Sequence, residues 1–372
     1  MTRAALLLLL VLSYLAGPAA SRDSASSGQP ADLDDSRDDG WRLSTPEAEG
    51  LSAARINELQ EFVRADPNKD LMGLLIARNG RIAYEGYFNG HDRRRLHDIR
   101  SATKSLTSSL VGIAIAHGLI SGVQAGMVEQ LSALGLDFRH LDLKREITVE
   151  HLLTMTSGLD ADEDDPASAG FEDRLYQSGD WVRFAADLPM SGTPGRKWAY
   201  ASVNTFLLGV MIEESADQSL AAFAKDRLFD PLGISEYRWA STPTGRTVAQ
   251  GNLSLRLRDT AKFGQLILDR GRWAGKQLVP ETWVEASTVG RYPVPWDGYD
   301  EYGYGWYLHE LGVRDRKFQY FFASGNGGNK IYVLPEQHML VVIQSAAYNR
   351  SYGQRRSLDV LKKVLEALVE GE

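Results

Sequence analysis

The segment Ser101-Ala102-Thr103-Lys104 places a hydroxyl and an amine at a spacing that suits covalent chemistry. It opens an apolar pattern of helical period, so the side chains of Ser101 and Lys104 are expected one helical turn apart on the same face. A helix N-terminus also supplies unpaired N–H groups and a partial positive charge, which would stabilise an oxyanion formed when Ser101 attacks a carbonyl carbon. Such a spacing is common by chance, and a serine at a helix start is usually a cap, so other residues must support the interpretation.

Three further segments supply that support. They are His151-Leu152-Leu153-Thr154-Met155-Thr156-Ser157-Gly158-Leu159, then Tyr200-Ala201-Ser202-Val203-Asn204, and finally Gly325-Asn326-Gly327-Gly328-Asn329 before an expected strand. Together with the Ser-x-x-Lys segment, they make the chain resemble the serine β-lactamase and penicillin-binding-protein superfamily, in its class C-like branch, from about residue 45 to the C-terminus. Within that branch the Tyr-x-Ser-x-Asn form is similar to that of esterases and 6-aminohexanoate-dimer hydrolases.

The resemblance implies a role for each matching residue. Ser101 would be the nucleophile that forms an acyl-enzyme, and Lys104 would accept its proton if burial keeps the amine neutral. Tyr200 would lie near both and pass the proton to the leaving group. The backbone N–H groups of Ser101 and Asn329 would form the oxyanion hole. Further candidates for contact with substrate are Gly328, Asn326, Ser202, Asn204, Tyr176 and Trp181.

Departures from the superfamily pattern bear on substrate choice. The Lys-Thr-Gly box of β-lactamases is replaced by Asn326-Gly327-Gly328, so a cation that would hold a substrate carboxylate is missing. Ser202 likewise stands where lactamases have Asn. Because one charge-assisted hydrogen bond contributes about 1.5–3 kcal/mol, neutral esters or linear amides are expected to react better than penicillins. Lys330 would replace the missing cation if its side chain turned into the cleft, and strand alternation leaves both directions open.

Periodicity and turn signals predict the elements that position these residues. Helices are expected at about 52–64, 101–117, 148–156, 203–215, 220–229, 258–268 and 355–369. Strands are expected at 71–78 and 81–87, joined by Asn79-Gly80, and at 318–323, 330–334 and 340–345. The predicted fold class is α+β: an antiparallel sheet built from N- and C-terminal segments, flanked by helices, with a mostly helical lobe inserted at about 105–290.

The N-terminus and the composition predict export. Residues 1–20 have a basic start, a leucine run and small residues at the end, as in a secretory signal peptide. Residues 21–40 are polar and are expected to be a disordered leader, and 41–372 would form the hydrolase domain. The expected location is secreted or periplasmic, without stable membrane insertion after cleavage. A net charge of -8 argues against nucleic-acid binding.

No metal or cofactor is assigned, because no ligand-spaced cluster accompanies His151, for which a structural role is favoured. The leading hypothesis is therefore an exported serine hydrolase that cleaves a small ester or amide through an acyl-enzyme on Ser101. Two alternatives stay open: a D-alanyl-D-alanine carboxypeptidase or weak β-lactamase that uses the same residues, and a non-catalytic ligand-binding protein that keeps the fold.

Overall fold

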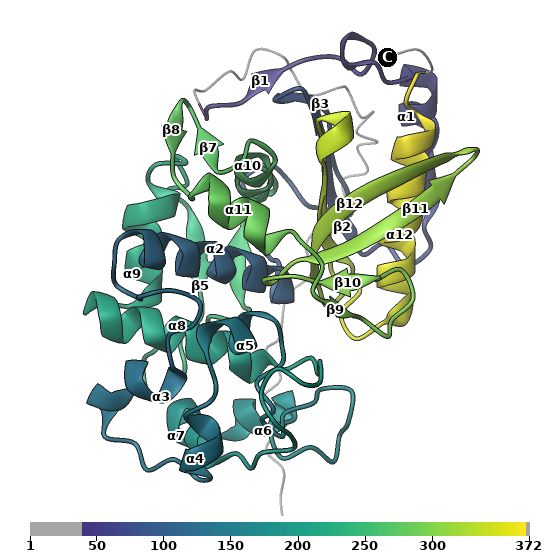
Figure 1. Ribbon diagram of the computed structural model, residues 1–372. Helices are drawn as coiled ribbons and strands as arrows, with labels where there is room; N and C mark the ends of the chain where they lie inside the picture. Colours follow the sequence, from purple (N-terminus) through teal and green to yellow (C-terminus); the bar gives the residue numbers. More distant parts are fainter. Residues whose placement is uncertain (1–38, 370–372) are drawn as a thin grey trace, which may run out of the picture. The chain divides into compact units, whose positions relative to one another are not determined.

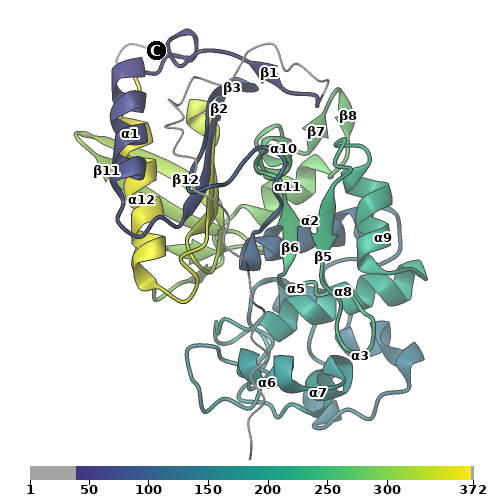
Figure 2. The same ribbon diagram turned by 180° about the vertical axis from the view of Figure 1, so that it is seen from behind.

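The centre of the fold is an antiparallel sheet to which both ends of the described chain contribute. The computed structural model describes residues 39–369, shown in Figures 1 and 2. The predicted signal peptide and residues 21–38 of the predicted leader lie outside the described residues. Within 39–369 the main sheet has nine strands in the order β1-β3-β2-β14-β13-β12-β11-β10-β9. The strands are β1 Arg42–Leu43, β2 Leu71–Arg78, β3 Arg81–Tyr87, β9 Tyr292–Pro293, β10 Glu301–Tyr302, β11 Tyr307–Val313, β12 Arg316–Gly325, β13 Asn329–Leu334 and β14 Met339–Ser345.

Strand pairing confirms the predicted fold class. Asn79 and Gly80 both adopt positive φ and turn β2 into β3, as the Asn-Gly signal predicts. β2 pairs on its other side with β14, where Leu75 lies opposite Val342 in an antiparallel register. Only the short β1 departs from the antiparallel pattern among these strands, since it runs parallel to β3. The sheet therefore combines segments from the two ends of the sequence.

Helices cover both faces of this sheet. α1 (Ala53–Ala65) and α12 (Ser351–Glu366) lie side by side over one face, as both views show. α10 (Leu257–Leu268) covers the other face and contacts β13 and β14. Successive residues of β14 accordingly enter different hydrophobic clusters, with Val341 on the α12 side and Val342 on the α10 side.

The segment between β4 and β9 contains the predicted helical lobe. Its longest helices, α2 and α8, are buried on nearly all sides and pack against each other, so neither shows a clear polar stripe. The other elements of this region are α3 Met127–Gln130, α4 Leu141–Lys144, α5 Val149–Leu153, α6 Glu172–Gln177, α7 Trp181–Asp187, α9 Leu220–Ala224 with a π-helical turn at Lys225–Phe229, and α11 Glu281–Ser287, beside α2 Thr103–Ala116 and α8 Ser202–Ala216. Two small sheets complete it, one of β4 His97–Asp98, β6 Leu253–Leu255 and β5 Tyr237–Trp239, the other of β7 Arg272–Trp273 and β8 Lys276–Gln277.

Several element bounds differ from the prediction. The helix expected at 148–156 ends at Leu153, because Met155 adopts a left-handed φ of 59° that an α-helix cannot accommodate. α12 begins at Ser351, four residues before its expected start. β11 was not expected, since polar residues interrupt its apolar pattern. No helix within residues 39–369 is long and apolar enough to cross a membrane.

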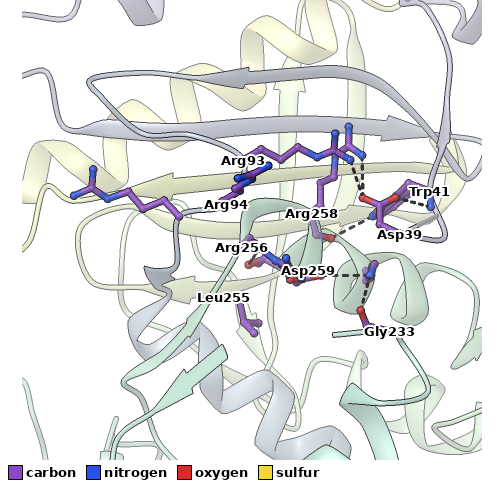
Figure 3. Close-up of polar contacts among 12 residues, drawn as sticks. Asp39, Trp41, Arg93, Arg94, Gly233, Leu255, Arg256, Arg258 and Asp259 are labelled. Atoms are coloured by element: carbon purple, nitrogen blue, oxygen red, sulfur yellow. Dashed lines mark hydrogen bonds and ion pairs between the residues drawn. The ribbon is translucent and has the colours of Figure 1, made fainter. Parts of the chain in front are cut away.

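A buried ion-pair network ties the first described residues to the sheet and to α10 (Figure 3). Arg258 of α10 pairs with Glu85 of β3 at 2.6 Å and with Asp39 at 2.9 Å. The Trp41 indole N–H donates to the backbone carbonyl of Arg258 at 3.2 Å. Because the side chains of Arg258 and Glu85 are only 7% and 4% exposed, each charge depends on its partner in place of water.

Candidate active site

Ser101 lies in a constrained turn that precedes α2. The turn is a 3₁₀ helix at Arg100–Ala102, and Arg100 has a φ of 53°, a conformation that costs a non-glycine residue about 1–3 kcal/mol. Two hydrogen bonds hold it: the Arg100 N–H donates to the Asp98 carboxylate at 2.8 Å, and the Thr103 hydroxyl donates to the Arg100 carbonyl at 2.7 Å. These hydrogen bonds thus hold the backbone beside Ser101 in its strained conformation.

The end of β12 is pressed against this turn. A Cβ atom on Gly325 would lie 2.2 Å from the Ile99 carbonyl oxygen and 3.2 Å from the Arg100 Cβ. Only glycine allows the strand to approach the serine turn so closely. The turn that follows β12 therefore borders the space in front of Ser101.

Lys104 is a buried amine held by polar groups. Its side chain is 3% exposed, and Nζ donates to the Ser202 hydroxyl at 2.9 Å and to the Gln250 carbonyl at 3.1 Å. Burial lowers the pKa of Lys104, while the negative charges of Glu163 and Glu172 act in the opposite direction. Burial thus favours the neutral amine, which can accept a proton, more than water does around an exposed lysine.

Tyr200 connects the serine to the amine. Its hydroxyl shares a hydrogen bond with Ser101, and its ring centroid lies 4.9 Å from Lys104 Nζ. Burial raises the pKa of Tyr200 well above its usual value, and the charge of Glu163 adds to this effect. Tyr200 is therefore a phenol at rest, suited to relay a proton, and Lys104 is the better candidate for the base.

Two carboxylates that the sequence did not single out complete the cluster. The backbone N–H of Ser202 donates to Glu163, and the Ser202 hydroxyl, which accepts from Lys104, donates to Glu172 at 3.1 Å. Burial and the nearby charge of Glu172 raise the pKa of Glu163, Lys104 and the Ser202 hydrogen bonds lower it, and the resulting pKa is about 7. The protonation of Lys104 and that of Glu163 thus depend on each other.

No local signal points to these acids. Glu163 falls in the run Asp160–Asp165, whose composition is typical of a solvated loop. It reaches Lys104 only because the loop folds back on α8, where the Glu163 N–H donates to the Tyr200 carbonyl at 2.9 Å.

The residues of the glycine-rich turn separate into different roles. Asn329 is 1% exposed and lies opposite Gly325 in the β12–β13 ladder, and its side-chain amide contacts Ser345 and His97. Gly328 packs against α12, where a Cβ would lie 2.3 Å from the Gly353 carbonyl. Asn326, which directly follows Gly325, is exposed. The oxyanion role of the Asn329 N–H stays a prediction, and the Asn326 N–H, next to Gly325 in the chain, is a second candidate donor.

Of the remaining predicted residues, some belong to the cluster around Lys104 and others are packed elsewhere in the helical lobe. Ser202 is part of it. Asn204 is 1% exposed, and its amide donates to the Met155 sulfur at 3.7 Å. Trp181 is 3% exposed and packs edge-on against Phe206, in the core of the helical lobe. The structure thus gives Asn204 and Trp181 packing positions, because both are enclosed by the lobe.

Tyr176 lies at the surface, 42% exposed, and donates to the Asn252 side chain at 2.8 Å. His151 caps α5 by accepting from the Thr148 N–H at 3.2 Å.

Comparison with known proteins agrees with this geometry. The family model described as β-lactamase matches residues 60–362. The 6-aminohexanoate-dimer hydrolase of Paenarthrobacter ureafaciens is 27% identical over 230 residues, which cover 58% of this chain and 56% of that protein. An uncharacterized protein of Alkalihalophilus pseudofirmus is 23% identical over 326 residues, covering 78% of this chain and 87% of the relative.

Solved structures show the same fold. A Bacillus anthracis protein provisionally classed as a 6-aminohexanoate-dimer hydrolase superposes with a TM-score of 0.70 at 19% identity, covering 88% of each chain. EstCE1, a hydrolase with promiscuous acyltransferase activity, superposes with a TM-score of 0.69 at 14% identity, covering 87% of this chain and 99% of its own. The chain belongs to the β-lactamase family. It is a hydrolase of that fold with amidase-like and esterase-like relatives.

Proposed function

We propose that this protein is an exported serine hydrolase that cleaves small esters or linear amides through an acyl-enzyme on Ser101. The observation that carries the proposal is the position of Tyr200, whose hydroxyl shares a hydrogen bond with Ser101 and whose ring centroid lies 4.9 Å from the buried Nζ of Lys104. A binding protein would need no buried amine beside a serine that shares its hydrogen bond with a tyrosine.

The chemistry follows from the geometry. Ser101 Oγ attacks the carbonyl carbon while its proton passes to Lys104. The backbone N–H of Ser101 and a backbone N–H of the turn that follows Gly325 stabilise the oxyanion. The tetrahedral intermediate collapses as the leaving oxygen or nitrogen takes the proton through Tyr200, which leaves an acyl-serine. Water then attacks the acyl carbon and gives a proton to the same relay, which passes a proton to Ser101 Oγ as the acyl–serine bond breaks and the carboxylic acid is released.

Substrate class is inferred from the relatives and from the end of β12. The named relatives include a 6-aminohexanoate-dimer hydrolase and EstCE1, a hydrolase with promiscuous acyltransferase activity. Neither Ala323-Ser324-Gly325 at the end of β12 nor the Asn326-Gly327-Gly328 segment that follows contains the lysine that β-lactamases carry in their third box. Both features favour open-chain esters and amides over β-lactams.

A substrate panel tests the proposal. The purified protein should hydrolyse p-nitrophenyl esters or short amides with a higher kcat/KM than nitrocefin, and a fluorophosphonate should label wild type but not Ser101→Ala. Faster turnover of nitrocefin than of esters would favour the β-lactamase or carboxypeptidase alternative. Absence of both labelling and turnover would favour the ligand-binding alternative.

Export is the second part of the proposal, supported by the signal-like composition of residues 1–20. Mass spectrometry of protein recovered from the medium or the periplasm should find an N-terminus between Ala19 and Arg22. A soluble cytoplasmic form that retains Met1 would contradict export without affecting the hydrolase assignment.

A further inference from the structure

His97 is a buried histidine that the steps of the proposed reaction do not use. It lies in β4, before the serine turn, and is 7% exposed. Its ring nitrogen Nε2 lies 2.9 Å from the Asn329 side-chain oxygen and 3.2 Å from the Ser345 carbonyl oxygen. One side chain thus connects the strand that leads to Ser101 with β13 and β14.

The acceptors around His97 determine which ring nitrogen carries the proton. The Asn329 amide nitrogen donates to the carbonyls of Asn326 at 2.9 Å and Ser345 at 3.0 Å, and neither carbonyl can donate. The amide oxygen therefore lies on the other side, where it accepts from the Ser345 N–H at 3.0 Å. Because Nε2 of His97 faces this oxygen and a carbonyl oxygen, Nε2 carries the proton. Burial lowers the pKa of His97 to about 4, so the ring is neutral at pH 7.

The Asn329 side chain extends this contact to the glycine-rich turn. The Asn326 carbonyl that it binds belongs to the residue directly after Gly325, in the turn proposed to offer the second oxyanion N–H. Alternation along β13 turns the next side chain, Lys330, to the other face, where its amine donates to the Tyr299 hydroxyl at 2.7 Å. The contact with His97 is therefore made by Asn329 and not by the neighbouring lysine.

An aromatic ring connects His97 to the same turn by a second route. The His97 ring stacks on Tyr348 at 6.3 Å between centroids. A Cβ atom on Gly327 would lie 2.9 Å from the Tyr348 ring, and the φ of 89° at Gly327 also favours glycine. Tyr348 is thus packed between the histidine and the backbone of the glycine-rich turn.

The backbone of His97 is fixed relative to the nucleophile. His97 lies opposite Leu255 in the pairing of β4 with β6, and the Ile99 N–H donates to the Leu253 carbonyl at 3.0 Å. The bonds of the serine turn follow directly in the chain. His97 therefore joins the serine turn, through its backbone, to the glycine-rich turn, through its side chain.

We propose that His97 is a positioning residue that holds the glycine-rich turn against the serine turn through the hydrogen bond from its Nε2–H to Asn329. The inference rests on the proposed function, in which these two turns carry the two N–H donors of the oxyanion hole. Loss of this bond should weaken stabilisation of the oxyanion, whereas the intact substrate should bind as before.

Two amides of different length isolate the Nε2–H bond. The amide nitrogen of glutamine reaches about as far as Nε2, whereas that of asparagine reaches only about as far as Nδ1. His97→Asn should reduce kcat for a p-nitrophenyl ester by about 100-fold and leave KM within about threefold of wild type. His97→Gln should lose less than about 10-fold, because it restores the donor. His309→Asn, at a mostly buried histidine of β11 beside Asp300, is the matched control and should leave kcat unchanged.

A tetrahedral adduct and hydrogen exchange separate positioning from general stability. Phenylboronic acid, which forms a tetrahedral adduct with a nucleophilic serine, should bind about 100-fold less tightly to His97→Asn, in parallel with the loss in kcat. Amide hydrogen exchange at 325–329 should be faster in His97→Asn than in wild type and His97→Gln, and this measurement requires no turnover. An inactive wild type with this exchange pattern would support the positioning role and contradict the proposed hydrolase function.

Thermal melts establish that His97→Asn is folded. Wild-type kcat in the folded variant would overturn the inference, and so would equal losses in the asparagine and glutamine variants. ¹⁵N NMR of histidine-labelled wild type is a test that does not depend on the asparagine variant, because the His97 signal is identified by its absence from His97→Gln. The neutral Nε2–H form at pH 7 would support the inference, and the neutral Nδ1–H form would overturn it.

Discussion

At the scale of single residues, hydrogen bonds connect the polar side chains of the catalytic cluster. Lys104 bonds to Ser202, Ser202 bonds to both Glu163 and Glu172, and Tyr200 shares a hydrogen bond with Ser101. The two acids stabilise the ammonium form of Lys104, whereas burial stabilises the neutral form. The availability of the base therefore depends on the charges of Glu163 and Glu172.

Lys104 and Tyr200 should behave as one unit. Lys104→Ala and Tyr200→Phe are each expected to reduce kcat by about 10³-fold or more, and the double variant should lose much less than the product because both residues act on one proton. Single-turnover rates with a p-nitrophenyl ester measure the losses. Strictly multiplicative losses would assign the two residues to independent steps.

Glu163→Gln should move the acidic limb of the kcat/KM profile to lower pH. The glutamine keeps an oxygen to accept from the Ser202 N–H but removes a negative charge that raises the pKa of Lys104. With that pKa lower, the amine stays neutral to lower pH, by about one unit for the loss of one nearby charge. Asp162→Asn, at a neighbouring acid that pairs with Lys197 instead, should leave the limb in place. A shift to higher pH would exclude this role for Glu163.

At the scale of elements, the contact between β12 and the serine turn sets the position of the nucleophile. Gly325→Ala would place a methyl group 2.2 Å from the Ile99 carbonyl, so β12 or the turn must move. A displacement of about 1 Å at a reacting group reduces turnover by roughly 100-fold. Gly312→Ala on β11 is the matched control, because its Cβ meets no atom within 4 Å. Wild-type kcat in folded Gly325→Ala would show that this contact does not position Ser101.

The elements also show what sequence patterns can and cannot predict. The Asn79-Gly80 turn and the alternating contacts of β14 depend on local geometry, and both were predictable from residue types. The i,i+3 relation of Ser101 and Lys104 is equally local. Glu163 reaches Lys104 only through a tertiary fold of its loop. The direction of the Lys330 side chain follows from the register opposite Ser324, which strand periodicity alone does not define.

At the scale of the whole molecule, Arg258 links three separate segments through Glu85 and Asp39. Arg258→Met would leave Glu85 buried and without its charge partner, and we expect a loss of about 3–5 kcal/mol in the free energy of unfolding. Urea titration monitored by circular dichroism measures this loss. The exposed pair Arg55 and Glu58 provides a control, since Arg55→Met should change stability by less than about 1 kcal/mol. An equally small effect at Arg258 would mean that water reaches Glu85 in the folded protein.

The pairing of β2 with β14 determines when the main sheet can be completed during synthesis. β2 is synthesised well before its partner strand, because Leu75 lies opposite Val342. Contacts between such distant residues require closure of a very long loop, which slows folding. Until β14 is available, the apolar edge of β2 has no native neighbour and the sheet is divided. The serine turn, held against β12, cannot reach its final position in a nascent chain that has not yet reached β12. We therefore expect activity only after β14 has been synthesised and has entered the sheet.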